Sequence, residues 1–165
     1  MAKESSFDVV SSVDMQEVDN AYQQAKKELK QRYDLKGSGS NIELDKSSGK
    51  LTVTAPSDFV AGQVIDIMSS KLIKRGVELG SVQWGSPVTA SGGNVVRTGD
   101  IVEGIDRDTA SKINKDIKAQ KFKVKVQIEG DHLRVSSPKR DTLQEVIAFL
   151  KDQDYGQPLQ YTNYR

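Results

Sequence analysis

Cysteine is absent from the chain, and histidine occurs once, at His132. Without thiols there can be no disulfide, thiolate zinc site or cysteine nucleophile. A single histidine, at the start of an expected hairpin strand, gives little basis for a hydrolytic triad or a metal centre. The two carboxylates of Asp106 and Asp108 suit a helix start, where they are favoured anyway. We therefore expect no enzyme, no catalytic residues, no metal and no cofactor.

Long hydrophobic runs are also absent. No stretch approaches the roughly 18 apolar residues of a membrane helix, and residues 1–10 lack the apolar core of a secretory signal. Together with the missing cysteines, this predicts a cytoplasmic protein without a membrane partner. The 24 basic and 23 acidic residues give a net charge of +1. That balance argues against a protein that coats a polyanion, although a local basic patch is compatible with it.

What the chain does contain is a repeat. The segment 51–68, LTVTAPSDFVAGQVIDIM, returns at 133–150 as LRVSSPKRDTLQEVIAFL, without a gap. Both copies show a short alternating strand, a proline that ends it and an amphipathic helix. A repeat of this kind indicates two copies of one supersecondary unit.

Hydrophobic periodicity and capping signals place the same elements in each half. The first half predicts a strand at 7–13, a helix from Asp14 to about Arg32, strands at 41–45 and 50–55, a helix from Ser57 to Gly76 and a strand at 81–84. The second half predicts a strand at 95–103, a helix after Asp106, strands at 122–129 and 132–137, a helix capped by Asp141 with Gln144, and a strand at 158–164.

The order β-α-β-β-α-β is that of a ferredoxin-like, RNP-like domain, a four-stranded antiparallel sheet with two helices on one face. We therefore predict an α+β protein formed by tandem duplication of this domain. Residues 1–88 form the first repeat and 95–165 the second. Residues 85–94, rich in glycine and serine, are expected to link them.

The candidate ligand-binding residues are cations and aromatic rings. Arg32, Tyr33, Lys36 and Ser38 surround a glycine-rich loop that could hold a phosphate and a base, or could simply end a helix. Arg75 ends the second long helix, where the helix dipole alone would explain a cation. Lys139 and Arg140 precede the expected cap of the last helix, where no dipole explains them.

Aromatic candidates stand at two strand ends. Trp84 is the only tryptophan and is either a core residue or a stacking platform. Tyr161 and Tyr164 lie in the last strand beside an amide and a guanidinium, a combination used to hold bases. Being three residues apart, they should point to opposite faces of a regular strand, with one of them in the core.

Several motifs resemble the bacterial YajQ family from residue 7 to residue 165, in order and with matching spacing. They include QRYDLKGSGSNIELD, SKLIKRGVEL, TASGGNVVR and PLQYTNYR. The resemblance implies tandem ferredoxin-like domains whose first strands can be exchanged between the sheets. Leu35 stands where the family has phenylalanine, and tyrosines stand at 161 and 164 where it has phenylalanines.

The resemblance implies nucleotide or nucleic-acid binding, and some members are cyclic di-GMP effectors. We expect a non-enzymatic nucleotide-binding protein, with cyclic di-GMP as its ligand, acting in signalling or gene regulation. The alternatives are a protein that binds RNA or DNA and a ligand-free interaction module, for instance one that contacts a transcription factor. Strands 50–55 and 132–137 contain no phenylalanine, tyrosine or tryptophan, which argues against RNA-recognition-type binding on either hairpin.

Overall fold

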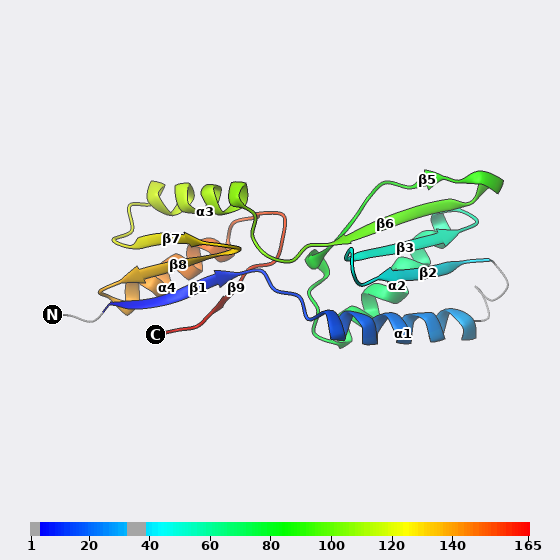
Figure 1. Cartoon of the computed structure of the whole chain (residues 1–165), viewed down its shortest axis with the longest axis horizontal. Coiled ribbons are helices and arrows are strands. Elements are labelled where there is room, and N and C mark those ends of the chain that lie inside the picture. The colour runs from blue at the N-terminus through cyan, green and yellow to red at the C-terminus, as the bar shows by residue number, and fades with distance from the viewer. Residues whose placement is uncertain (1–3, 33–38) are drawn as a thin grey trace. The chain divides into compact units, whose positions relative to one another are not determined.

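The computed structural model describes residues 4–32 and 39–165, and the chain forms two compact units. Unit 1 combines the residues up to Ser12 with Glu103–Arg165, and unit 2 is Val13–Val102. Each unit contains an antiparallel sheet and two long helices (Figure 1). This confirms the predicted α+β architecture of two ferredoxin-like domains.

Unit 2 has its sheet in the strand order β2-β3-β6-β4, with the short β5 also paired to β6. Helices α1 and α2 share one hydrophobic core with the inward residues of this sheet. The elements are α1 (Met15–Gln31), β2 (Asn41–Asp45), β3 (Lys50–Ala55), α2 (Asp58–Lys74), β4 (Val82–Trp84), β5 (Val88–Thr89) and β6 (Val95–Ile101), with 3-10 turns at Leu79–Ser81 and Ser91–Gly93.

Unit 1 has its sheet in the order β7-β8-β1-β9. Phe7 and Val9 of β1 and Leu133 and Val135 of β8 are buried beneath α3 and α4, so both helices cover one face. The elements are β1 (Ser5–Val10), α3 (Arg107–Ala119), β7 (Lys125–Glu129), β8 (His132–Ser137), α4 (Arg140–Lys151) and β9 (Gln160–Thr162).

The first strand of each half lies in the sheet of the other half. β1 pairs with β8 and β9, whereas β6 pairs with β3 and β4. The units therefore differ from a division into residues 1–88 and 95–165. Residues 85–94, expected to be a linker, lie inside unit 2, where they connect β4 to β6 and contain β5, which also pairs with β6. The pattern of side chains along a strand indicates which of them face the core, but it does not specify which sheet the strand joins.

Most predicted helix ends are confirmed. The side chains of Asp14, Ser57 and Asp106 accept hydrogen bonds from the first turns of α1, α2 and α3. Gly76, with φ 77°, ends α2, and its N–H and that of Val77 bond back to Ile73 and Leu72 in a Schellman arrangement.

The predicted cap of α4 is wrong. The Oγ of Ser137 accepts a hydrogen bond from the N–H of Lys139 at 3.2 Å. The helix consequently starts at Arg140, before Asp141 and Gln144, and its N-cap, Lys139, makes no side-chain capping bond.

Within residues 4–32 and 39–165, no helix is long and apolar enough to cross a membrane.

Candidate functional site

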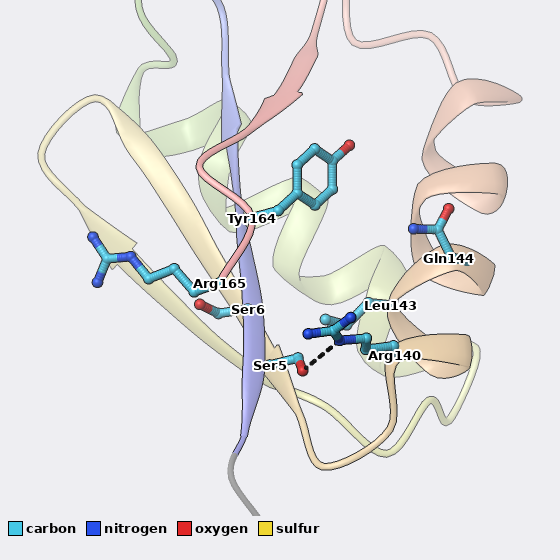
Figure 2. A pocket seen from close by; sticks show the side chains of 7 residues that line it. All are labelled: Ser5, Ser6, Arg140, Leu143, Gln144, Tyr164 and Arg165. Carbon is cyan, nitrogen blue, oxygen red and sulfur yellow. Dashed lines mark hydrogen bonds between the residues drawn. The ribbon is translucent and has the colours of Figure 1, made fainter.

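Unit 1 contains a cavity of about 220 Å³ between the start of β1, the first turns of α4 and the segment after β9 (Figure 2). We call it the Arg140 cavity. Its lining residues are Ser5, Ser6, Arg140, Leu143, Gln144, Tyr164 and Arg165.

Arg140 supplies the positive charge of this cavity. Its Nε donates a hydrogen bond to the Oγ of Ser5 at 3.4 Å (Figure 2). A guanidinium has five N–H donors, so most of them remain available. The described part of the chain gives Arg140 no carboxylate partner. The charge is therefore free to meet an anionic ligand.

An extra residue in the edge strand shapes the opposite wall. β9 pairs with β1 as far as Thr162, which lies opposite Asp8. Pairing resumes at Arg165, which exchanges two backbone hydrogen bonds of 3.0 and 3.4 Å with Ser6. Three steps along this segment thus match two steps along β1, and the mismatch is a β-bulge.

The bulge is centred on Asn163, which has φ 58°. Asparagine tolerates this left-handed conformation better than most residues, and its Nδ2 donates to the Oδ2 of Asp8 at 2.8 Å. The bulge turns Tyr164 to the helix side of the sheet, where the rings of Tyr161 and Tyr164 lie 6.1 and 6.3 Å from the ring of Phe7. The prediction that the two tyrosines point to opposite faces is therefore wrong.

The two tyrosines differ in exposure although they share a face. Tyr161 is partly buried against the core, whereas Tyr164 is 61% exposed. Figure 2 shows the Tyr164 ring and the Gln144 amide on opposite sides of the opening, while the Arg165 side chain points away from Arg140. The buried Leu143, beside Arg140 in Figure 2, adds an apolar surface to the lining. The cavity thus combines a cation, a ring, an amide and a hydroxyl.

Lys139 and Tyr161 lie outside this lining. Lys139 immediately precedes Arg140 as the N-cap of α4. Tyr161 lines a second cavity of about 320 Å³ at the other end of α4. We call this the Tyr155 cavity, and its lining residues are Leu150, Lys151, Gln153, Tyr155, Gln157, Pro158, Leu159 and Tyr161.

The other predicted site residues belong to unit 2 or to undescribed residues. Tyr33, Lys36 and Ser38 lie outside the described residues. Arg32 ends α1, whereas Arg75 ends α2 and pairs with Glu17, in the first turn of α1, at 3.9 Å. The 17 residues of α1 span about 25 Å at 1.5 Å per residue. The two arginines therefore do not converge on one site.

Trp84 lies on the helix-facing side of the unit 2 sheet. It is directly opposite Gly99 of β6, and a Cβ on that glycine would lie 2.9 Å from the indole Cε3. The ring is partly buried and packs against the core of unit 2. This packing favours the first of the two predicted roles of Trp84, that of a core residue.

The helix-free face of the unit 1 sheet carries a charged network. The buried Asp8 pairs with Arg134 at 3.2 Å, and Arg134 also lies 3.7 Å from Glu129. His132 contacts Glu129 and Asp131 at 3.5 and 3.3 Å. Among the described strand residues, the outward positions hold no phenylalanine, tyrosine or tryptophan. This face offers no ring for stacking a base, and no described group of three or more acidic or histidine side chains could hold a metal ion.

Five lining residues of the Arg140 cavity were not among the predicted site residues: Ser5, Ser6, Leu143, Gln144 and Arg165. Gln144 follows Arg140 by four residues on one helix, a spacing that places both on the same side. From this spacing, the sequence could have predicted that Gln144 lies beside Arg140. Ser5 carried no signal, because its contact with Arg140 spans 135 residues.

A family model described as "Nucleotide-binding protein YajQ-like" matches residues 5–165. The chain belongs to the YajQ-like family. It is 50% identical over 163 residues to a "Nucleotide-binding protein" of Nocardia farcinica, covering 98% of this chain and 99% of that protein. It is 48% and 45% identical over 165 residues to proteins with the same name from Desulfitobacterium hafniense and Chloroherpeton thalassium, covering 100% of each chain.

Proposed function

We propose that this YajQ-like chain is a non-enzymatic nucleotide-binding protein and that the Arg140 cavity holds part of the nucleotide. The observation that carries the proposal is that the Arg140 guanidinium, which has no carboxylate partner among the described residues, and the exposed Tyr164 ring lie on one opening. A guanidinium pairs with phosphate through two parallel N–H bonds. A tyrosine ring stacks on a base. The names of the relatives support nucleotide binding in general.

The ligand proposed is cyclic di-GMP, and the role is that of an effector in signalling or gene regulation. Support for both comes from the family resemblance. Pockets that enclose a whole drug-sized ligand measure about 300–1,000 Å³, whereas this cavity measures about 220 Å³. One nucleotide unit of the dinucleotide occupies the cavity, and the other lies over the exposed surface beside Tyr164.

Calorimetric titration with cyclic di-GMP, GTP and a short single-stranded RNA, at low and physiological salt, tests the proposal. Arg140→Ala should weaken cyclic di-GMP binding at least tenfold, because charge-assisted hydrogen bonds contribute about 1.5–3 kcal/mol. Arg107→Ala is the matched control. Arg107 is the first residue of α3, as Arg140 is of α4, and it is exposed.

The other outcomes are equally informative. RNA binding that falls steeply with salt, without binding of cyclic di-GMP, would favour the nucleic-acid alternative. Loss of cyclic di-GMP binding in Arg75→Ala or Trp84→Phe, but not in Arg140→Ala, would move the site to unit 2. If none of the three ligands bound, the alternative of a ligand-free interaction module would be favoured.

A further inference from the structure

The Tyr155 cavity is separate from the proposed nucleotide site. It shares no lining residue with the Arg140 cavity. Lys151, on its rim, lies eleven residues after Arg140 on α4, or about 16 Å along the helix at 1.5 Å per residue. The volume of the Tyr155 cavity, about 320 Å³, falls within the range of small-molecule sites.

The apolar part of this cavity consists of two tyrosine rings and the aliphatic side chains of Leu150, Pro158 and Leu159. Tyr155 is fixed, because its hydroxyl donates to the Oδ2 of Asp116 at 2.8 Å. Burial, and then the hydrogen bond to the Asp116 carboxylate, raises the pKa of Tyr155. Burial also raises the pKa of Tyr161, so both phenols stay neutral at physiological pH. With the buried Leu150, they present surfaces suited to a flat, uncharged ring.

The polar part consists of two amides and one ammonium group. Gln153 uses its Nε2 to donate to the carbonyl of Phe149 at 3.4 Å, and Gln157 uses its Nε2 to donate to the carbonyl of Gly104 at 2.7 Å. Each amide thus keeps its Oε1 as an acceptor. Lys151 is the only charged residue in the lining. A ligand that matches these groups has N–H donors on a planar ring and an anionic group.

We infer that the Tyr155 cavity is a second binding site, for a purine nucleoside monophosphate with an exocyclic amino group. The base lies against the tyrosine rings and donates to the glutamine oxygens, and the phosphate meets Lys151. The inference does not depend on the Arg140 cavity.

The test follows the side-chain amide resonances of Gln153 and Gln157 by NMR while the full chain is titrated with GMP. Both should shift saturably. Lys151→Met and Gln153→Ala should each weaken this binding about tenfold, as the loss of a charge contact or a hydrogen bond does. Both side chains are exposed, so the fold should survive. Gln144→Ala, which removes the same amide from the other cavity, should leave this binding unchanged. IMP, which lacks the amino group, should bind about tenfold more weakly.

Three results would overturn the inference: no saturable shift of the two amides, equal affinity for GMP and IMP, or affinity unchanged in both variants. Unchanged cyclic di-GMP binding in Arg140→Ala would overturn only the placement of the nucleotide in the Arg140 cavity, so the two failures are distinguishable.

Discussion

At the scale of single residues, Asn163 shapes one wall of the candidate site. Its positive φ and its bond to Asp8 create the bulge that turns Tyr164 toward Arg140. The sequence showed two tyrosines three residues apart and predicted opposite faces. That prediction failed because a bulge inserts a residue that a regular strand pattern does not anticipate.

Replacing Asn163 separates backbone strain from the hydrogen bond. Asn163→Gly and Asn163→Ala both lose the bond to Asp8, but only alanine bears the cost of the left-handed conformation. We expect Asn163→Ala to be less stable than Asn163→Gly by about 1 kcal/mol in chemical denaturation. Equal stability of the two variants would mean that the bulge imposes no backbone requirement.

Asp8 should make stability depend on acid pH. Burial alone would raise the pKa of Asp8, but hydrogen bonds from Asn163 and Arg134 and the charges of Arg134 and His132 hold it below its ordinary value of 3.8. A carboxyl with a lowered pKa in the fold stabilises the protein above its unfolded pKa, and this contribution is lost as the pH falls through the folded pKa.

Denaturation at a series of pH values tests this. Below about pH 4, the wild type should lose more of its free energy of unfolding than Asp8→Asn does. Asp66→Asn, at an exposed position of α2, controls for the general effect of removing a carboxylate. Parallel pH profiles of the wild type and Asp8→Asn would contradict the assignment.

At the scale of elements, the side chains of Val82 and Trp84 on β4 pack over Gly99 of β6, because this glycine has no side chain. A Cβ there would lie 2.8 Å from Val82 Cγ1 and 2.9 Å from Trp84 Cε3. Gly99→Ala should therefore lower the free energy of unfolding by about 1–3 kcal/mol through overpacking. Gly62→Ala is the matched control, because Gly62 lies in α2 with no atom within 4 Å of a Cβ. It should raise stability by about 0.5–1 kcal/mol. Thermal or chemical denaturation measures the free energy of unfolding of both variants. If Gly99→Ala were as stable as the wild type, the close packing of Trp84 over Gly99 would be refuted.

Elements were predictable where the signal is local. Asp14, Ser57, Asp106 and Gly76 mark helix ends because their side chains or φ values act within one turn. The start of α4 was missed because Ser137, two residues before the N-cap, fixes that turn. Only two lining residues of the Arg140 cavity were predicted. Arg140 and Tyr164 were predicted from their charge and aromaticity. Ser5 was not, because it lies in β1, and the local residue pattern of β1 does not show which sheet that strand joins.

At the scale of the whole molecule, the exchange of first strands decides which pieces of the chain can fold. Unit 2 is continuous from Val13 to Val102, whereas residues 1–88 lack β6, which joins β3 to β4. A fragment of residues 13–102 should give dispersed NMR spectra and a cooperative unfolding transition. Residues 1–88 should give neither, because β4 would have no neighbouring strand and inner backbone groups would be left unpaired. A cooperatively folded fragment 1–88 would contradict the exchanged pairing.

The central claim is that a nucleotide binds beside Arg140 and Tyr164. The most direct measurement maps backbone amide shifts of the full chain on addition of cyclic di-GMP. We predict that the largest saturable changes fall on Ser5, Ser6, Arg140, Gln144 and Tyr164, and that Arg140→Ala removes them. Saturable changes confined to unit 2, or none at these five residues, would contradict the account.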